Sequence, residues 1–287
     1  MSFLDDATLQ NLESKANQIR QSIVSMLVEA KSGHTAGPLG MADIFTAFYF
    51  HILHHDPKNP ALSDRDRLIL SNGHIVPVRY AAMAHAGYFP IEELQTLRKF
   101  GSRLQGHPER HALPGVETTS GPLGEGLSQG SGIAYAGRMD KKKFFTYVLL
   151  SDGEMQCGLT WEAGMFAAAN KLGNLIAVID RNNIQINGTT EDVMPLEPLA
   201  DKWRAFGWHV QEVDGHNISG FIDAINHAKA ITTAPSMIIA HTIPGKGITD
   251  IEYDFKWHGT PPNADQGKEF LKELRTLQGQ IEGGHSE

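Results

Sequence analysis

The sequence predicts a single doubly wound α/β domain over residues 1–278, with a mostly parallel sheet and helices on both faces. Two observations predict this fold class. Short runs of apolar and β-branched residues alternate with longer segments whose apolar residues recur with the helical period. Each short run is almost continuously apolar and leads into Gly, Asn or Asp, which is typical of strands buried on both faces of a parallel sheet.

In chain order, the apolar runs are RLILS, TYVLLS, LIAVID, WHVQEVD and SMIIAHT, and we expect strands at 67–71, 146–151, 175–180, 208–214 and 236–242. The helical period indicates helices at 6–32, 40–52, 124–138, 158–172, 218–231 and 263–278. No internal repeat, low-complexity linker or break in composition divides the chain. The segment GQIEGGHSE, residues 279–287, is expected to be a disordered tail.

Composition narrows the classes of function. A chain of 287 residues, 41% of them hydrophobic, can bury a large core. A net charge of −8 argues against nucleic-acid binding, and the one basic cluster, DKKK at 140–143, is interpreted as the solvated end of a helix. One cysteine excludes an internal disulfide. Without a signal-like N-terminus or a membrane-length apolar segment, the sequence predicts a soluble, cytoplasmic protein with no membrane partner.

Polar residues follow the second and third predicted strands, at the sheet edge where α/β proteins bind ligands. Asp152 and Gly153 follow the second strand, and Asn182 and Asn183 follow the third. A carboxylate, an amide oxygen and a backbone carbonyl suit magnesium, and Gly153 would let a phosphate approach backbone N–H groups. Each motif alone reads as an ordinary turn. Because they are about thirty residues apart, as a βαβ unit requires, the pair favours a metal–diphosphate site.

A second glycine cluster, TTSGPLGEGLSQGSG at 118–132, opens a predicted helix. It lacks the Gly-Lys-Ser/Thr of a phosphate-binding P-loop, and it does not clearly follow a strand as a dinucleotide fingerprint would. The small residues would let a flat cofactor ring lie against the backbone, or they would let the start of the helix pack tightly. The sequence leaves both interpretations open.

Histidines in glycine-flanked loops give a third indication of function. They suggest polar groups that converge on a hydroxylated substrate, where imidazole donates, accepts or carries protons near neutral pH. These residues are His34, His74, His107 and His258. Another group has helical metal-ligand spacing but stands at a helix end before Asp-Pro, and it is interpreted as structural. It consists of His51, His54 and His55.

Several motifs follow one another along the chain and form one collinear pattern. They are SGHTAGPLGMADIF, RDRLILSNGH, LQGHPE, TTSGPLGEGLSQGSGIA, SDGEMQCGLTWEAGMFAAANKLGNLIAVIDRNNIQING and the later KGI and WHG motifs. This pattern resembles the N-terminal, diphosphate-binding half of a transketolase. The resemblance runs from about the first helix to His258 and implies the thiamine diphosphate-binding fold.

The resemblance also implies thiamine diphosphate and a divalent ion, magnesium or else calcium or manganese. The implied metal ligands are the side chains of Asp152 and Asn182 and the carbonyl of Ile184. The implied cofactor contacts are His74, Gly121, Leu123, Gly153, Asn182 and His258. The implied catalytic residues, which bind donor hydroxyls and relay protons, are His34, His74, His107 and His258.

The implied activity is the transfer of a two-carbon ketol unit from a ketose to an aldose. Full-length transketolases are more than twice this long, so the chain is similar to the N-terminal subunit of a split transketolase. The pyrimidine-binding and C-terminal domains would then belong to a partner subunit, in an α2β2 complex. The glutamate that activates the cofactor lies in that other half, so the resemblance implies an incomplete active site in this chain.

Three positions depart from the family pattern. Ser151 replaces a glycine, Asn187 replaces a common aspartate, and Cys157 stands where a glutamate is usual. These changes, above all Cys157, put in doubt the proton network between active sites and leave the metal site intact. Alternative functions are a transketolase for a sulfonated or branched sugar and a non-catalytic paralogue that binds a partner.

Overall fold

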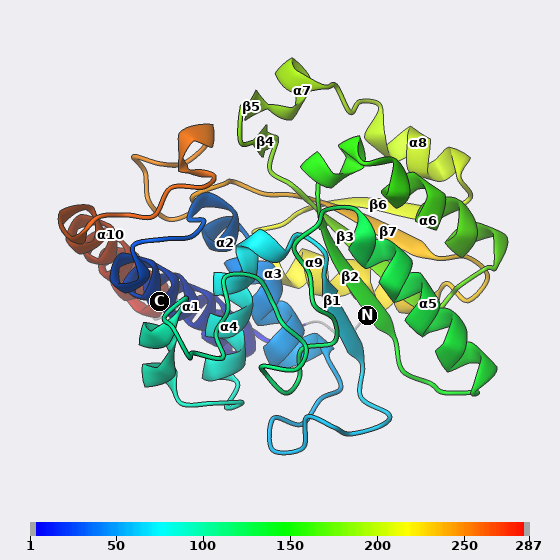
Figure 1. Cartoon of the computed structure of the whole chain (residues 1–287), viewed down its shortest axis with the longest axis horizontal. Helices are drawn as coiled ribbons and strands as arrows, with labels where there is room; N and C mark the ends of the chain where they lie inside the picture. The colour runs from blue at the N-terminus through cyan, green and yellow to red at the C-terminus, as the bar shows by residue number, and fades with distance from the viewer. Residues whose placement is uncertain (1–3, 284–287) are drawn as a thin grey trace.

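One parallel sheet of five strands forms the centre of the structure, a computed structural model that describes residues 4–283 (Figure 1). The strands lie in the order β1-β2-β3-β7-β6, and each neighbouring pair is parallel. Their bounds are β1 (Arg67–Leu70), β2 (Thr146–Ser151), β3 (Leu175–Arg181), β6 (His209–Asp214) and β7 (Ser236–His241). The five predicted strands and the α/β fold are therefore confirmed.

Helices cover both faces of this sheet (Figure 1). In chain order the helices of the described residues are α1 (Asp6–Ala30), α2 (Ala36–Gly40), α3 (Ala42–Ala47), α4 (Val76–His85), α5 (Glu125–Met139), α6 (Gly158–Ala169), α7 (Thr190–Val193), α8 (Leu199–Ala205), α9 (Ile218–Ala230) and α10 (Ala264–Gly283). A short antiparallel pair, β4 (Ile184–Gln185) and β5 (Gly188–Thr189), follows β3. Two of the helices lie away from the five-stranded sheet: α10 packs on α1, and α7 lies beside β5 (Figure 1).

Several helices differ from the sequence prediction. The segment expected to be one helix at 40–52 ends as α3 and continues in a π-helical turn, Phe48–Ile52. Helix α4 was not predicted, because it is buried on nearly all sides and shows no amphipathic period. Helix α10 continues to Gly283, into the expected tail at 279–287, and the rest of that segment lies outside the described residues.

Successive strand residues belong to two separate apolar clusters, one on each face of the sheet. Along β2, Tyr147 and Leu149 pack into the cluster that includes α1, α3, α4 and α9. Val148 and Leu150 pack into the cluster that includes α5, α6 and α8. Because both faces are covered, both sets of side chains must be apolar, which explains why the strands read as unbroken apolar runs. Within residues 4–283, no helix combines the length and apolar character needed to cross a bilayer.

The parallel arrangement places the carboxyl ends of β1, β2 and β3 at one edge of the sheet. His74 lies in the 3-10 turn after β1. Asp152 follows β2 directly, and Asn182 follows β3 directly. Residues from three distant parts of the sequence are therefore brought to the same edge.

Candidate active site

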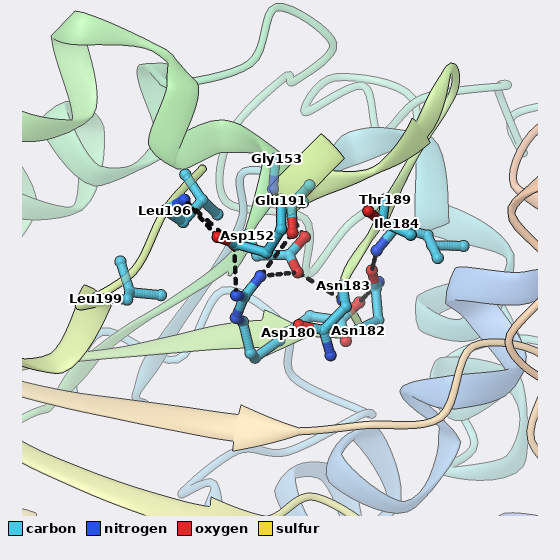
Figure 2. A network of polar contacts seen from close by, with 12 residues as sticks. Asp152, Gly153, Asp180, Asn182, Asn183, Ile184, Thr189, Glu191, Leu196 and Leu199 are labelled. Carbon is cyan, nitrogen blue, oxygen red and sulfur yellow. Dashed lines mark hydrogen bonds and ion pairs between the residues drawn. The ribbon is translucent and has the colours of Figure 1, made fainter. Parts of the chain in front are cut away.

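Asp152 is the centre of a buried polar network at the end of β2 (Figure 2). Its Oδ2 accepts hydrogen bonds from the backbone N–H of Asn183 at 2.7 Å and from Arg181 Nη1 at 3.1 Å. Its Oδ1 accepts from the N–H of Gly153 at 2.8 Å. Burial raises the pKa of Asp152 to about 6, although Arg181 and the backbone donors oppose this rise. The carboxylate is thus held in one orientation by donors from β2 and β3.

Asn182 is oriented by a second buried carboxylate, Asp180. The Asn182 amide nitrogen donates to Asp180 Oδ2 at 2.8 Å, and Asp180 Oδ1 accepts from the hydroxyl of Thr242 after β7. The Asn182 Oδ1 accepts from the backbone N–H of Ile184 at 3.0 Å. Burial raises the pKa of Asp180 to about 7. Asp180 therefore fixes which way the Asn182 amide oxygen points.

Arg181 is a member of this network that the sequence analysis missed. Its side chain is 3% exposed and lies between Asp152 and the segment after β5. There it donates to Thr190 Oγ1 at 2.8 Å and to carboxylate oxygens of Glu191 and Glu197 at 2.9 Å each. A buried guanidinium needs anionic partners, so an arginine at the end of an otherwise buried strand is the signal that points to this network.

The oxygen atoms at this edge fit a hard divalent ion. The candidate donors are the Asp152 carboxylate, the Asn182 amide oxygen and the Ile184 carbonyl, which come from the ends of β2 and β3 and from β4 (Figure 2). Among residues 4–283 there is no group of three or more His, Cys, Asp or Glu side chains that would hold a metal unaided. An ion here would therefore need further oxygens, such as those of a diphosphate. At the adjacent Gly153, an added Cβ would make ordinary contact with Gln185 at 3.7 Å.

Glu154 fastens the glycine-rich segment to the sheet. Its Oε1 accepts from the Ser71 hydroxyl, at the end of β1, and from the Gly124 N–H at 2.8 Å. Its Oε2 accepts from the Ser151 N–H at 2.9 Å. Burial raises the pKa of Glu154, and these donors oppose the rise. The carboxylate thereby joins β1, β2 and the start of α5, a role that the sequence analysis did not assign.

The glycine cluster packs the start of α5 tightly, and the loop before it leaves room for a flat ring. Gly126 and Gly130 pack α5 against the sheet, since a Cβ on either would lie 2.3 Å from Ser71 or Val148. Gly124 has φ 88° and begins the helix. Ahead of it, Leu123 is 40% exposed, and a Cβ at Gly121 would meet the His107 ring at an ordinary 3.8 Å. The loop therefore presents a small residue and an exposed apolar side chain, which suit a flat ring.

Three of the predicted histidines form one cluster. The ring centroid of His34 lies 4.9 Å from that of His74 and 5.4 Å from that of His258, and the His74 and His258 centroids are 5.1 Å apart. Burial lowers the pKa of His34 to about 4, holds that of His74 well below its usual range and lowers that of His258. The rings are therefore neutral at pH 7 and can both donate and accept hydrogen bonds.

His107 lies close enough to this cluster that its charge contributes to the lowered pKa values of His34 and His74. Burial, with a smaller effect of Arg98, lowers the pKa of His107 itself. The Arg98 guanidinium is held by Ser32 Oγ at 2.9 Å and by the Gly106 carbonyl at 3.2 Å. The structure thus brings all four predicted histidines into one region.

The other histidine group is structural, as expected. His55 contacts the Tyr88 hydroxyl and the Tyr49 carbonyl at 2.9 Å each. His54 faces the Asp64 carbonyl, whereas His51 is exposed. The three rings therefore have different surroundings and do not converge on a metal.

Comparison with known proteins identifies the class to which this fold and these groups belong. Residues 12–278 match the family described as "Transketolase, thiamine diphosphate binding domain". The chain belongs to this family, which confirms the resemblance seen in its motifs.

The particular relatives include subunits of similar length. The chain is 42% identical to the 6-deoxy-6-sulfo-D-fructose transketolase subunit SqwG of Clostridium sp. (strain MSTE9), covering 92% of this chain and 96% of that protein. It is 41% identical to an apulose-4-phosphate transketolase subunit of Phocaeicola vulgatus, covering 93% of this chain and 94% of that protein.

Longer transketolases match over part of their length. The transketolase of Pongo abelii is 38% identical, and the match covers 94% of this chain but 43% of that protein. Among solved structures, the transketolase from Leishmania mexicana superimposes with a TM-score of 0.87 at 34% identity, over 93% of this chain and 41% of that chain. The transketolase from Campylobacter jejuni also gives a TM-score of 0.87 at 34% identity, over 94% of this chain and 43% of that chain. This chain therefore corresponds to less than half of these longer enzymes.

Proposed function

We propose that the chain is the thiamine diphosphate-binding subunit of a transketolase, which transfers a two-carbon ketol unit from a ketose donor to an aldose acceptor. One observation carries the proposal. In this chain, which belongs to the family, the carboxyl edge of the sheet holds both a set of oxygen donors and a cluster of neutral histidines. The oxygen donors suit a metal ion bound to a diphosphate. Bound thiamine diphosphate supplies the electron sink that allows a ketose carbon–carbon bond to break.

In this proposal the chain holds the cofactor through three groups of residues. Asp152, Asn182 and Ile184 offer oxygens to magnesium, with Asp152 kept in place by Arg181 and Asn182 by Asp180. The N–H groups near Gly153 and the His74 and His258 imidazoles would hold the diphosphate. Gly121 and Leu123 would provide the surface for the cofactor rings.

The histidines bind and orient the sugar. Because the pKa of His34 is about 4, its imidazole is uncharged at neutral pH and can accept a hydrogen bond from a hydroxyl at one nitrogen while donating at the other. The same holds for His74 and His258, whose pKa values are also lowered. Such a ring takes a proton transiently from a substrate hydroxyl and returns it. We assign His107, at the edge of the cluster, to substrate binding.

We further propose that the active enzyme is an α2β2 complex with a C-terminal transketolase subunit, and that it works in the cytoplasm on carbohydrate intermediates such as those of the pentose phosphate pathway. Two relatives named as transketolase subunits match this chain over nearly their full length, which supports a separate partner. The single free cysteine, Cys157, fits a reducing compartment.

A donor and acceptor screen on the co-expressed pair tests the activity. The donors are xylulose 5-phosphate, fructose 6-phosphate, 6-deoxy-6-sulfofructose and apulose 4-phosphate, each with aldose acceptors. The expected result is ketol transfer by the pair and none by the purified chain alone. Turnover by the chain alone would contradict the need for a partner, and no transfer from any donor by a cofactor-loaded pair would contradict the activity.

Calorimetric titration of the complex with thiamine diphosphate, with and without Mg²⁺, tests the site. Asp152→Asn keeps the shape but removes the charge, so the magnesium-dependent part of the affinity should be lost. Asp214→Asn, at the exposed end of β6, is the matched control. Unchanged affinity in Asp152→Asn would refute the metal assignment. In the same assay His107→Ala should keep cofactor affinity, while its donor KM rises or its kcat falls.

A further inference from the structure

A group of cationic side chains lies at the amino-terminal edge of the sheet, opposite the edge that holds the candidate active site. A surface cavity of about 700 Å³ opens beside the amino-terminal ends of β2 and β3, where helices α5, α6 and α9 end. Figure 1 shows the C-terminal end of α5 turning into the start of β2 here. Six cationic side chains line this cavity, which we call the basic cavity: Arg138, Lys141, Lys142, Lys143, Lys171 and Lys229.

The helix ends alone do not account for this positive charge. Each helix C-terminus carries about −0.5 of an elementary charge, so the three that meet here supply about −1.5. Two carboxylates lie nearby: Asp140 at the end of α5, and Asp66, which faces Lys229. The six positive charges still exceed the combined negative charge of the three helix ends and the two carboxylates by more than two elementary charges. Within residues 4–283 none of the six side chains forms an ion pair with a carboxylate. The excess is concentrated on a chain whose net charge is −8.

Two of the lysines occupy a backbone conformation that glycine adopts more easily. Lys141 has φ 55° and Lys171 has φ 50°, and they follow the ends of α5 and α6 respectively. The left-handed region costs a residue with a side chain about 1 kcal/mol. Helices commonly use glycine at this position. The sequence places a lysine at the end of both helices, as it also does at the end of α1 (Lys31, φ 52°), but only Lys141 and Lys171 line this cavity.

The rest of the lining adds an apolar wall. Phe144 and Phe145 form part of the wall, and the Lys229 ammonium lies 5.8 Å from the Phe145 ring centroid. Asn174 donates its amide N–H to the Ala134 carbonyl at 2.9 Å, and its Oδ1 is enclosed by protein, so this side chain fixes the end of the cavity to α5. The lining therefore combines cationic groups with an apolar surface, against which the part of a ligand without phosphate can pack.

We propose that the basic cavity binds a phosphorylated small molecule, either a nucleotide or a sugar bisphosphate, away from the active site. The exposed lysines neutralise the phosphates, and Arg138, whose Nη1 already donates to the Asn170 and Lys171 carbonyls, adds its charge to them. The cavity volume lies in the range of small-ligand sites. Such a site would let a phosphorylated metabolite bind without competing with the sugar at the carboxyl edge.

Isothermal titration calorimetry of the co-expressed complex tests the proposal. Thiamine diphosphate and Mg²⁺ are kept at saturating concentration, so that the cofactor site is filled, and the titrants are ADP and fructose 1,6-bisphosphate. At least one titrant should bind, and the tighter of the two identifies the ligand class. If neither binds to the wild-type complex, the proposal is overturned.

The double variant Lys141→Gly/Lys171→Gly separates binding from folding. Glycine relieves the left-handed conformation, so the thermal midpoint should not fall, while the Kd of the titrant should rise about tenfold or more. Lys142→Gln/Lys143→Gln provides a second test on exposed side chains. The charge-matched control is Lys268→Gln/Lys272→Gln on α10. Equal weakening in this control, or an unchanged Kd in both test variants, would overturn the site.

Discussion

The neutral histidine cluster should lower the free energy of unfolding of the metal-free chain as the pH falls. The size of this contribution can be worked out for His34. Its pKa is about 4 in the folded chain, against an ordinary value of 6.5. Between these two values the unfolded state binds more protons, so the free energy of unfolding falls as the pH falls. For a single group with these two pKa values, linkage gives a loss of about 2 kcal/mol between pH 8 and pH 5.

The measurement is urea unfolding at 25 °C, followed by tryptophan fluorescence at several pH values from 8 to 5. The total slope is not diagnostic, because the raised pKa values of Asp152 and Asp180 stabilise the folded chain on acidification and act in the opposite direction. The difference between wild type and His34→Gln removes those contributions. The variant should lose about 2 kcal/mol less than wild type over this range.

His51→Gln, at an exposed position, controls for the loss of an imidazole elsewhere on the molecule. Its unfolding free energy should follow that of wild type at every pH. Parallel curves for wild type and His34→Gln would refute the argument, because they would mean that His34 is not held neutral by burial.

Three further substitutions test the buried contacts. In Glu154→Gln an amide N–H faces a backbone N–H that the wild-type carboxylate accepts from, so the free energy of unfolding in urea should fall by about 2 kcal/mol. The control is Glu125→Gln, in the first turn of α5, which should lose less than about 1 kcal/mol, the contribution of a charge at a helix N-terminus. Arg181→Met leaves the Asp152 carboxylate buried without its cation and should lower the free energy of unfolding by about 3 kcal/mol, whereas Arg181→Lys should recover part of this. Cys157→Ala should leave the kcat of the reconstituted complex largely unchanged, because burial and the nearby Glu154 raise the pKa of its thiol and keep it protonated. A large fall in kcat with an intact fold would instead make the thiol functional.

The sequence predicted the strands well because their environment is uniform. A strand covered on both faces must be apolar throughout, and β2 and β3 show this over their whole length. Helix α4 escaped detection for the same reason, since burial on nearly all sides removes the helical period. Helix α8 has seven residues, too few for a period to be recognised.

The candidate site was predictable where its residues directly follow strands. Asp152 and Asn182 could be placed at one edge because topology alone brings strand ends together. Arg181 and Glu154 could not be assigned, because their roles depend on partners far away in the chain. Arg181 and Asp152 are 29 positions apart, and Glu154 and Ser71 are 83 apart. Side-chain direction over such separations is decided by packing, which periodicity does not report.

The hydrogen bonds of Glu154 also constrain the order in which the chain acquires its shape. The acceptor for the Gly124 N–H belongs to the turn after β2, and the same carboxylate oxygen accepts from Ser71 at the end of β1. The glycine-rich segment precedes β2 in the chain, so it cannot gain this acceptor until Glu154 has been made. Proteins rich in contacts of wide sequence separation fold slowly, because loop closure must come before the contact. A chain truncated before Glu154 therefore lacks the carboxylate that holds the segment proposed to receive the cofactor rings.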